Sequence, residues 1–149
     1  MSEEQMQGGC ACGRVRFTAN IANDEAYLCH CRMCQRATGS VSIAFKQVTL
    51  TDVAWESEPN WYASSPIARR PFCAQCGTSL GFAFNEGSDK MDLTVAAFDD
   101  PSRFVPKWHF GAEEIQRPWL NTAGLPEHKT TDYQVLVDKW VEATGSVPV

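Results

Sequence analysis

Cysteines stand in three tight groups along this chain, at spacings typical of metal ligands. The middle group offers three thiols and each outer group offers two: Cys29, Cys31 and Cys34; Cys10 with Cys12; and Cys73 with Cys76. Two outer pairs together make the four sulfurs of a closed structural zinc site, whereas three sulfurs leave a zinc ion with a vacant position. The spacing therefore predicts one structural ion and one open site at which chemistry could occur.

The division into four and three thiols has local support. Gly13 and Gly77 directly follow a cysteine of each outer pair, and glycine allows the tight backbone turn that a metal knuckle needs. Another division stays open, in which the middle group borrows one thiol from an outer pair and the other three form the open set. We favour the pairing of the two outer groups.

Zinc is the expected metal, and disulfides or iron–sulfur clusters are the alternatives. The number of cysteines is odd, and the N-terminal stretch 1–5 is acidic and polar without an apolar signal core, so we expect a cytoplasmic protein with reduced thiols. An iron–sulfur cluster usually takes four cysteines, and metals that prefer carboxylates would not choose thiolates. We therefore expect two zinc ions, one structural and one catalytic.

Size and charge exclude several other functions. A chain of 149 residues is long enough to fold as one domain around its own core. Its 13 basic and 18 acidic residues give a net charge of 13 − 18 = −5, which disfavours nucleic acid as a partner. Because no apolar run approaches the roughly 20 residues that span a bilayer, we expect no membrane segment.

Apolar residues alternate with polar ones over much of the chain, which predicts β-strands. Strands with one solvated face are expected at 14–18, 41–46 and 91–96, and further strands at 26–29, 48–55, 67–72 and 79–84. A short helix is expected from Cys34 to Gly39, and a C-terminal helix over about 132–144. Residues 1–7 and 146–149 are expected to be loose. The pattern favours a mainly β, antiparallel fold with one or two short helices.

The motifs together resemble the glutathione-dependent formaldehyde-activating enzyme family, which includes centromere protein V. The resemblance rests on Gly8-Gly9-Cys10-Ala11-Cys12-Gly13, on Cys29-His30-Cys31-Arg32-Met33-Cys34 ending at Gly39-Ser40, on Phe72-Cys73-Ala74-Gln75-Cys76-Gly77, and on Asp99-Asp100-Pro101, His109 and Trp119. It covers about residues 8–120. It implies an antiparallel β-tent zinc-binding fold and a single domain over 1–149, with a structural zinc on the outer cysteine pairs and a catalytic zinc on the middle group.

The resemblance also implies a zinc-dependent carbon–sulfur lyase that forms or cleaves a thiol–aldehyde adduct such as S-(hydroxymethyl)glutathione. At the open position a thiol would lose its proton more easily and attack the carbonyl carbon of formaldehyde. Arg32 and Arg36 flank the middle cysteines and are candidates to bind the carboxylates of glutathione. His109 is the candidate general acid or base. His30 is expected to point away from the ion shared by its neighbouring cysteines.

A non-catalytic, zinc-stabilised protein-binding module is the alternative, with the middle group completed by a side chain or a partner. A redox or metal-storage protein with labile thiols is a third interpretation. Because the middle group has no obvious fourth ligand, we favour the enzyme over these two alternatives. The sequence does not identify the thiol, the carbonyl compound or the oligomeric state.

Overall fold

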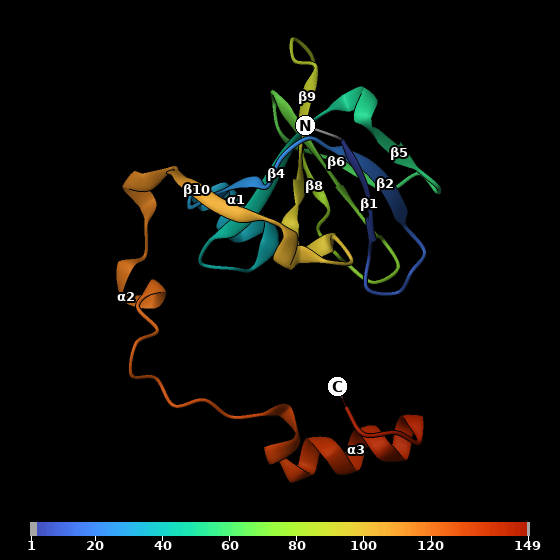
Figure 1. Ribbon diagram of the computed structural model, residues 1–149, viewed down its shortest axis with the longest axis vertical. Coiled ribbons are helices and arrows are strands. Elements are labelled where there is room, and N and C mark those ends of the chain that lie inside the picture. The colour runs from blue at the N-terminus through green and yellow to red at the C-terminus, as the bar shows by residue number, and fades with distance from the viewer. Residues whose placement is uncertain (1–2, 149) are drawn as a thin grey trace. The chain divides into compact units, whose positions relative to one another are not determined.

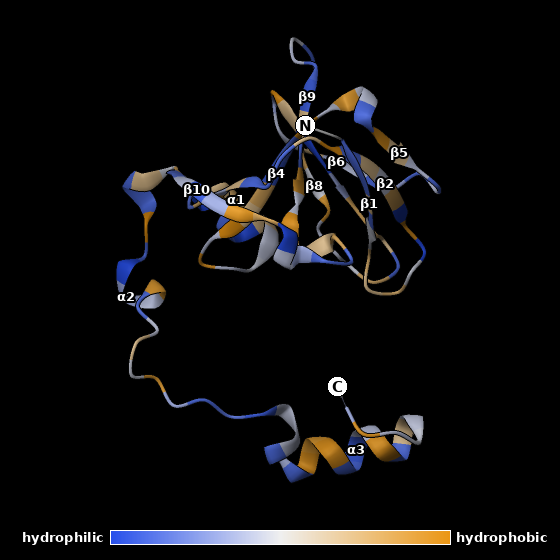
Figure 2. Ribbon diagram, viewed as in Figure 1, coloured by the Kyte–Doolittle hydropathy of each residue, from blue (hydrophilic) through white to orange (hydrophobic). Residues whose placement is uncertain are grey.

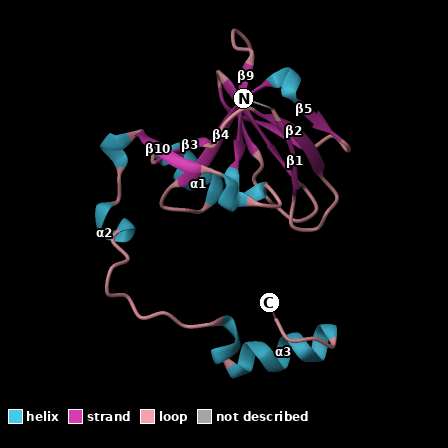
Figure 3. Ribbon diagram, in the orientation of Figure 1, coloured by secondary structure: helices cyan, strands magenta, loops and turns pink. Residues whose placement is uncertain are grey.

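A computed structural model describes residues 3–148, in which strands dominate and the helices are short (Figure 1). The chain divides into two compact units, one ending at Arg117 and the other running from Pro118 onward. Figure 3 shows that the strands lie in the first unit, which also holds both cysteine sites. The predicted mainly β fold is confirmed. The grouping of both units into one domain stays a prediction.

The smaller sheet has three antiparallel strands in the order β1 (Glu4–Gly9), β2 (Arg16–Ile21) and β5 (Val53–Trp55). The expected alternation holds along β2, where Phe17, Ala19 and Ile21 are fully buried in the main core. The prediction of a loose N-terminus is wrong from Glu4 onward, because β1 pairs with the whole of β2. Residues 1–2 and 149 lie outside the described residues.

The larger sheet has seven strands in the order β10-β3-β4-β9-β8-β7-β6. Their bounds are β3 Glu25–Cys29, β4 Ile43–Thr49, β6 Asn60–Ser65, β7 Ala68–Phe72, β8 Gly81–Phe84, β9 Lys90–Thr94 and β10 Val105–Phe110. All neighbours are antiparallel except β10 and β3, which are parallel. The expectation of a purely antiparallel fold is therefore wrong at this edge, where the chain returns to pair beside β3.

Two strands depart from the predicted pattern of one solvated face. In β9, at the centre of the large sheet, Asp92 and Thr94 are buried as well as Met91 and Leu93. In β4, Lys46 is only 5% exposed, and its Nζ donates to the backbone oxygen of Glu25 at 2.8 Å. Alternation along one strand cannot reveal that its second face is also covered.

The segment 48–55 was expected to be one strand, but it serves both sheets. Strand β4 ends at Thr49, a 3-10 turn spans Leu50–Asp52, and β5 then joins the smaller sheet. The missed strand β6 lies at the far edge of the large sheet, where it pairs with β7. The chain therefore leaves the large sheet after β4, joins the small sheet at β5 and returns to the large sheet at β6.

Three α-helices occur in the described residues: α1 Arg32–Thr38, α2 Arg117–Leu120 and α3 Gln134–Thr144. Helix α1 starts earlier than predicted and ends at Gly39 as expected; α2 was not predicted. The ribbon of α3 alternates between apolar and polar turns, yet none of its residues is buried (Figure 2). None of the helices within residues 3–148 has the length and apolar composition needed to cross a bilayer.

Candidate metal centres and active site

The four outer cysteines meet where two turns from different sheets come together. The turn between β1 and β2 supplies Cys10 and Cys12, and the turn between β7 and β8 supplies Cys73 and Cys76. Cys12 Sγ lies 3.5 Å from Cys10 Sγ and 3.7 Å from Cys73 Sγ. Because four sulfurs at about 2.3 Å from a tetrahedral zinc ion stand about 3.8 Å apart, this four-cysteine cluster fits zinc.

Neighbouring groups hold these sulfurs as hydrogen-bond acceptors. The backbone N–H of Val15 donates to Cys10 Sγ at 3.2 Å, and Arg14 Nε donates to Cys73 Sγ at 3.3 Å. The Thr78 hydroxyl lies 3.1 Å from Cys76 Sγ, and this contact lowers the pKa of the Cys76 thiol to about 5. Gly13 and Gly77 adopt the positive φ angles that the two knuckle turns require. The surroundings thus favour the thiolate, the form that binds metal, at Cys73 and Cys76. The backbone hydrogen bond at Arg14 lowers the pKa of Cys12, but burial and the neighbouring thiols outweigh it and raise this pKa to about 11.

The three middle cysteines lie where β3 passes into α1. Cys29 is the last residue of β3, Cys31 is the N-cap of α1, and Cys34 lies in the helix's first turn. Cys29 Sγ is 3.6 Å from Cys31 Sγ and 3.3 Å from Cys34 Sγ. Within residues 3–148, no fourth histidine, cysteine or acidic ligand joins this three-cysteine cluster. The spacing fits a zinc ion with one position left for another ligand.

Two groups support the sulfur of Cys34. The Cys29 thiol donates to it, and Arg70 on β7 donates through Nη2 at 3.3 Å. These two hydrogen bonds lower the pKa of the Cys34 thiol to about 5, against burial, which raises it. The hydrogen bond with Cys34, and burial after it, raise the pKa of Cys29. Each cysteine cluster therefore receives one guanidinium hydrogen bond, from Arg14 in one case and from Arg70 in the other.

A pair of histidines lies beside the three-cysteine cluster. His30 is fully buried, and its Nε2 lies 2.8 Å from Nδ1 of His109 on β10. The parallel pairing of β10 with β3 sets this contact, because the backbone N–H of His30 donates to the oxygen of Phe110 at 2.9 Å. Burial lowers the pKa of His30, and the neighbouring His109 adds to this effect. His109 itself is exposed.

The residue after β10 holds this edge close to the cysteines. Gly111 has a φ of +64°, and a Cβ built there would lie 2.8 Å from the backbone nitrogen of Cys31. A side chain at this position would thus push against the ligand segment. Gln35 of α1 adds a polar tie, because its Nε2 donates to the oxygens of His30 at 2.7 Å and Glu114 at 3.2 Å. Together they fix the helix start against β10.

A cavity of about 320 Å³ adjoins the three-cysteine cluster. We call it the arginine cavity; it is lined by Met33, Arg36 and Ala37 of α1, Tyr62 and Ser64 of β6, and Arg70 of β7. Arg70 connects the two places, since it both lines the cavity and donates to Cys34. Arg32 is not part of the lining; its guanidinium donates to Gln35 Oε1.

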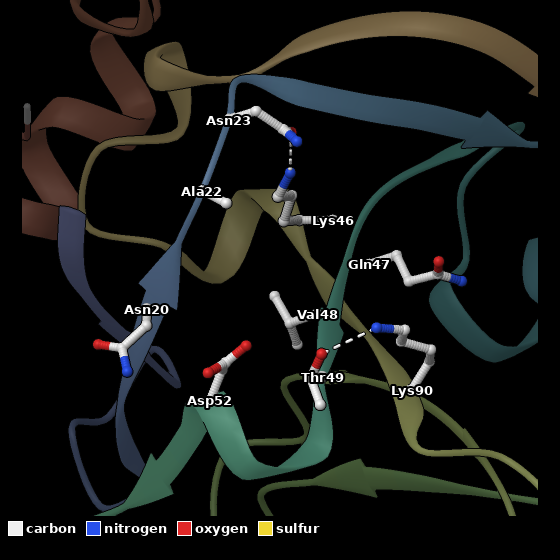
Figure 4. Close-up of a pocket in the computed structure, with 9 residues that line it drawn as sticks. All are labelled: Asn20, Ala22, Asn23, Lys46, Gln47, Val48, Thr49, Asp52 and Lys90. Atoms are coloured by element: carbon white, nitrogen blue, oxygen red, sulfur yellow. Dashed lines mark hydrogen bonds between the residues drawn. The ribbon is translucent and has the colours of Figure 1, made fainter. Parts of the chain in front are cut away.

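A second cavity, of about 170 Å³, lies away from both cysteine clusters and is shown in Figure 4. Two lysines line it, and both are already paired. Lys46 Nζ donates to Asn23 Oδ1 at 2.7 Å, and Lys90 Nζ donates to Thr49 Oγ1 at 2.9 Å. Since Asp52 also lines this cavity, its cations have local partners and it offers no comparable site for an anion.

The structure brings together the residue sets that the sequence divided as four and three. It places His109 at the histidine pair, and it places Arg36 and Arg32 in different surroundings. His30 points to His109 and is not in the group of cysteine ligand atoms, and His128 lies exposed in the second unit. Gln35 and Gly111 were missed, because no local motif marks a contact with a distant strand.

The protein is thus of the mainly β class and carries one four-cysteine and one three-cysteine cluster. Residues 5–113 match the family described as glutathione-dependent formaldehyde-activating enzyme. The chain belongs to this family.

Two individual proteins are also similar. An uncharacterized lyase of Schizosaccharomyces pombe is 33% identical over 94 residues, which cover 63% of this chain and 69% of that protein. A crystal structure of a Rhodobacter sphaeroides protein superposes with a TM-score of 0.57 at 22% identity, covering 70% of this chain and 100% of that one. The second likeness concerns the fold alone.

Proposed function

We propose that this protein is a zinc-dependent carbon–sulfur lyase that forms or cleaves a thiol–aldehyde adduct such as S-(hydroxymethyl)glutathione. Family membership and the lyase relative support a lyase of this type. The observation that carries the proposal is the three-cysteine cluster, which has the sulfur spacing of a zinc site and, within residues 3–148, no fourth ligand. A purely structural zinc site would be closed by four.

The two clusters would hold two ions with different roles. Cys10, Cys12, Cys73 and Cys76 would enclose a structural zinc, and Cys29, Cys31 and Cys34 would hold the catalytic one. A zinc ion in the second site would supply a position at which the substrate thiol loses its proton near neutral pH. The three thiolates keep that position soft, so it suits sulfur.

The reaction joins one sulfur to one carbon. The substrate's sulfur attacks the aldehyde carbon, a carbon–sulfur bond forms, and the π electron pair of the carbonyl moves to its oxygen. That oxygen takes up a proton and becomes the hydroxyl of the adduct, so the thiol's proton is conserved overall. The reverse reaction removes the hydroxyl proton and breaks the same carbon–sulfur bond.

His109 is our candidate for the proton transfer. Its Nδ1 is engaged with His30, so Nε2 is the ring nitrogen that remains for exchange with substrate or solvent. Because burial lowers the pKa of His30, that ring stays neutral and acts as a fixed partner that orients His109. The pair thus keeps an exposed imidazole in one orientation beside the ligand segment.

Binding and location complete the proposal. Arg36 and Arg32 lie on the helix that carries Cys34, and their charges suit the carboxylates of glutathione. The described cysteines are all free, which agrees with a reducing compartment, and we propose the cytoplasm as the place of action. The partners are a small thiol and an aldehyde.

Metal counting and exchange kinetics test the function. The adduct also forms without a catalyst, so the quantity to measure is the rate at which ¹³C-formaldehyde exchanges with S-(hydroxymethyl)glutathione, by exchange NMR. We expect two zinc ions per chain and an exchange rate that rises in proportion to protein concentration. A full zinc complement with the uncatalysed exchange rate would favour the non-catalytic binding module instead.

His109→Gln should slow exchange by about 100-fold, in the range typical for loss of a general acid or base, without changing the zinc content. Glutamine keeps a polar partner for the buried His30 but cannot carry a proton. The control is His128→Gln, which changes an exposed histidine of the second unit. Equal exchange rates for both variants and the unchanged protein would remove His109 from the mechanism.

A further inference from the structure

The three-cysteine cluster is more deeply buried than the four-cysteine cluster, so water solvates its charge less well. Cys29 and Cys34 are 3% and 5% exposed, whereas Cys12 and Cys76 of the other cluster are exposed to solvent. Zinc carries two positive charges, so three thiolates would leave the filled site with net negative charge, and a bound substrate thiolate would add to it. Buried charge is costly unless an opposite charge lies nearby. The open site therefore needs a cation close to its sulfurs.

Arg70 supplies such a cation. Its side chain is buried, and its Nη2 donates to Cys34 Sγ at 3.3 Å. The ring of Phe82 lies 5.1 Å from the guanidinium carbon and fixes the group from one side. Lys46 is the other buried lysine or arginine in residues 3–148, and it is engaged elsewhere, since its Nζ donates to the Glu25 oxygen. Arg70 is thus the buried positive charge that contacts this cluster.

The guanidinium of Arg70 is not neutralised by an ion pair. Among the described residues Arg70 forms no salt bridge, and its hydrogen bond goes to the sulfur of Cys34. The nearby buried carboxyl belongs to Asp92 on β9. Burial raises the pKa of Asp92 to about 6, contact with Tyr27 lowers it, and the charges of Cys34 and Arg70 act on it in opposite directions. One buried cation therefore faces both the sulfurs and this carboxyl.

We propose that Arg70 is a positioning residue of the open metal site: acting through Cys34, its guanidinium offsets the negative charge of the cluster, so that the fourth position prefers an anionic sulfur to a neutral ligand. This inference rests on the proposed function, because it takes that position as the place where the substrate thiol binds. Hydrogen bonds to ligating atoms tune metal sites in this way, and their loss typically changes metal affinity or activity by about 10- to 100-fold.

Two other arginines serve as controls. Arg14 Nε also donates to a ligand, Cys73 Sγ at 3.3 Å, but in the four-cysteine cluster, where two of the sulfurs are exposed to water. Arg69 is next to Arg70 on β7, and its guanidinium lies 4.9 Å from the ring of Trp61. The first control keeps the kind of contact and changes the cluster, whereas the second keeps the strand and the charge.

Ligand titrations of the cobalt-loaded full chain test this inference, because cobalt(II) can replace zinc and its visible absorption reports the ligands that it binds. The probes are 2-mercaptoethanol, which binds metal as a thiolate, and imidazole, which binds as a neutral ligand. Arg70→Met should weaken binding of the thiol by about tenfold or more and leave imidazole binding unchanged. Arg70→Lys keeps the charge and should bring the thiol affinity back toward that of the unchanged protein. Arg69→Met and Arg14→Met should change neither affinity.

Asp92→Asn should shift the preference in the opposite direction. It removes a negative charge near the cluster, so we expect the thiol to bind about threefold more tightly and imidazole to bind as before. Asparagine keeps an oxygen for the contact with Tyr27. A loss of packing would not strengthen binding of one ligand alone, so this variant tests the charge itself. It also decides the outcome if Arg70→Met fails to fold.

Three results would overturn the inference: equal weakening of both ligands by Arg70→Met, unchanged thiol binding in that variant, or weaker thiol binding in Asp92→Asn. Exchange kinetics with formaldehyde separate this failure from that of the lyase. Thiol binding that follows the charge of these variants, together with uncatalysed exchange, would support the role of Arg70 and refute the enzyme. Accelerated exchange in a protein whose thiol affinity does not depend on Arg70 would support the enzyme and refute this inference.

Discussion

Replacing Cys31 by Ser should remove one of the two zinc ions and return thiol–aldehyde exchange to its uncatalysed rate, while the chain stays folded. Cys31 contributes one of only three sulfurs in its cluster, so its loss leaves two, too few to hold zinc firmly. Its Sγ also accepts the backbone N–H of Cys34 as the N-cap of α1, a role that a serine oxygen can fill. Zinc content by mass spectrometry, thermal unfolding and exchange NMR measure the three quantities.

Cys31→Ala distinguishes the loss of helix capping from the loss of metal binding. We expect it to lose the same zinc ion and the same activity as Cys31→Ser, but also about 1 kcal/mol of stability, because alanine cannot cap the helix. A serine variant that kept both zinc ions and full exchange activity would show that Cys31 is not a ligand. If the middle group instead took its fourth thiol from an outer pair, both Cys31→Ser and Cys31→Ala would lower the stability of the protein.

Replacing Cys76 by Ala should lower the melting temperature by about 10 °C or more, because structural zinc sites contribute directly to folding free energy. The four-cysteine cluster connects the β1–β2 turn of the small sheet to the β7–β8 turn of the large one. Besides the ion, the two turns are joined by the Ala11 N–H donating to Thr78 Oγ1 at 3.0 Å and by Arg14 Nε donating to Cys73 Sγ at 3.3 Å. Since Cys76 itself is exposed, little apolar burial is lost with its side chain.

Gln75→Ala is the matched control, since Gln75 is an exposed residue of the same turn and is not part of the cluster. It should leave the melting temperature and the zinc content unchanged. Cys76→Ala should also lose activity at temperatures where it unfolds, in contrast to the folded but inactive Cys31→Ser. Equal loss of stability in the Cys31 and Cys76 variants would refute the division into a catalytic and a structural ion.

Local sequence sufficed for the three cysteine groups because the members of each group stand one to three residues apart in the chain. That the two outer pairs meet, with Gly13 and Gly77 in their turns, was a favoured prediction, and the structure brings those four sulfurs together. The periodic segments likewise predicted β2 and α3 within a few residues. The sequence did not predict β1, β6 and β10. All three are edge strands, which depend on a neighbouring strand for their conformation.

The second faces of the strands were beyond the reach of periodicity. Lys46 and Asp92 occupy positions that alternation assigned to solvent, yet both are buried. What covers them comes from other parts of the chain: Asn23 and the Glu25 carbonyl accept hydrogen bonds from Lys46, and Tyr27 interacts with Asp92. A single strand's pattern reports only whether one face is apolar, and says nothing of a polar face that is also covered.

By itself the sequence determined which side chains can bind metal, how many each cluster has and the mainly β class, because these depend on residue type and short spacing. Only the tertiary structure decided what surrounds the open cluster. It brings His109 to His30 across 79 residues and Arg70 to Cys34 across 36, through strand pairings that no local pattern encodes. The grouping of the cysteines is thus largely local, whereas the histidine pair and the arginine contact with Cys34 are products of the fold.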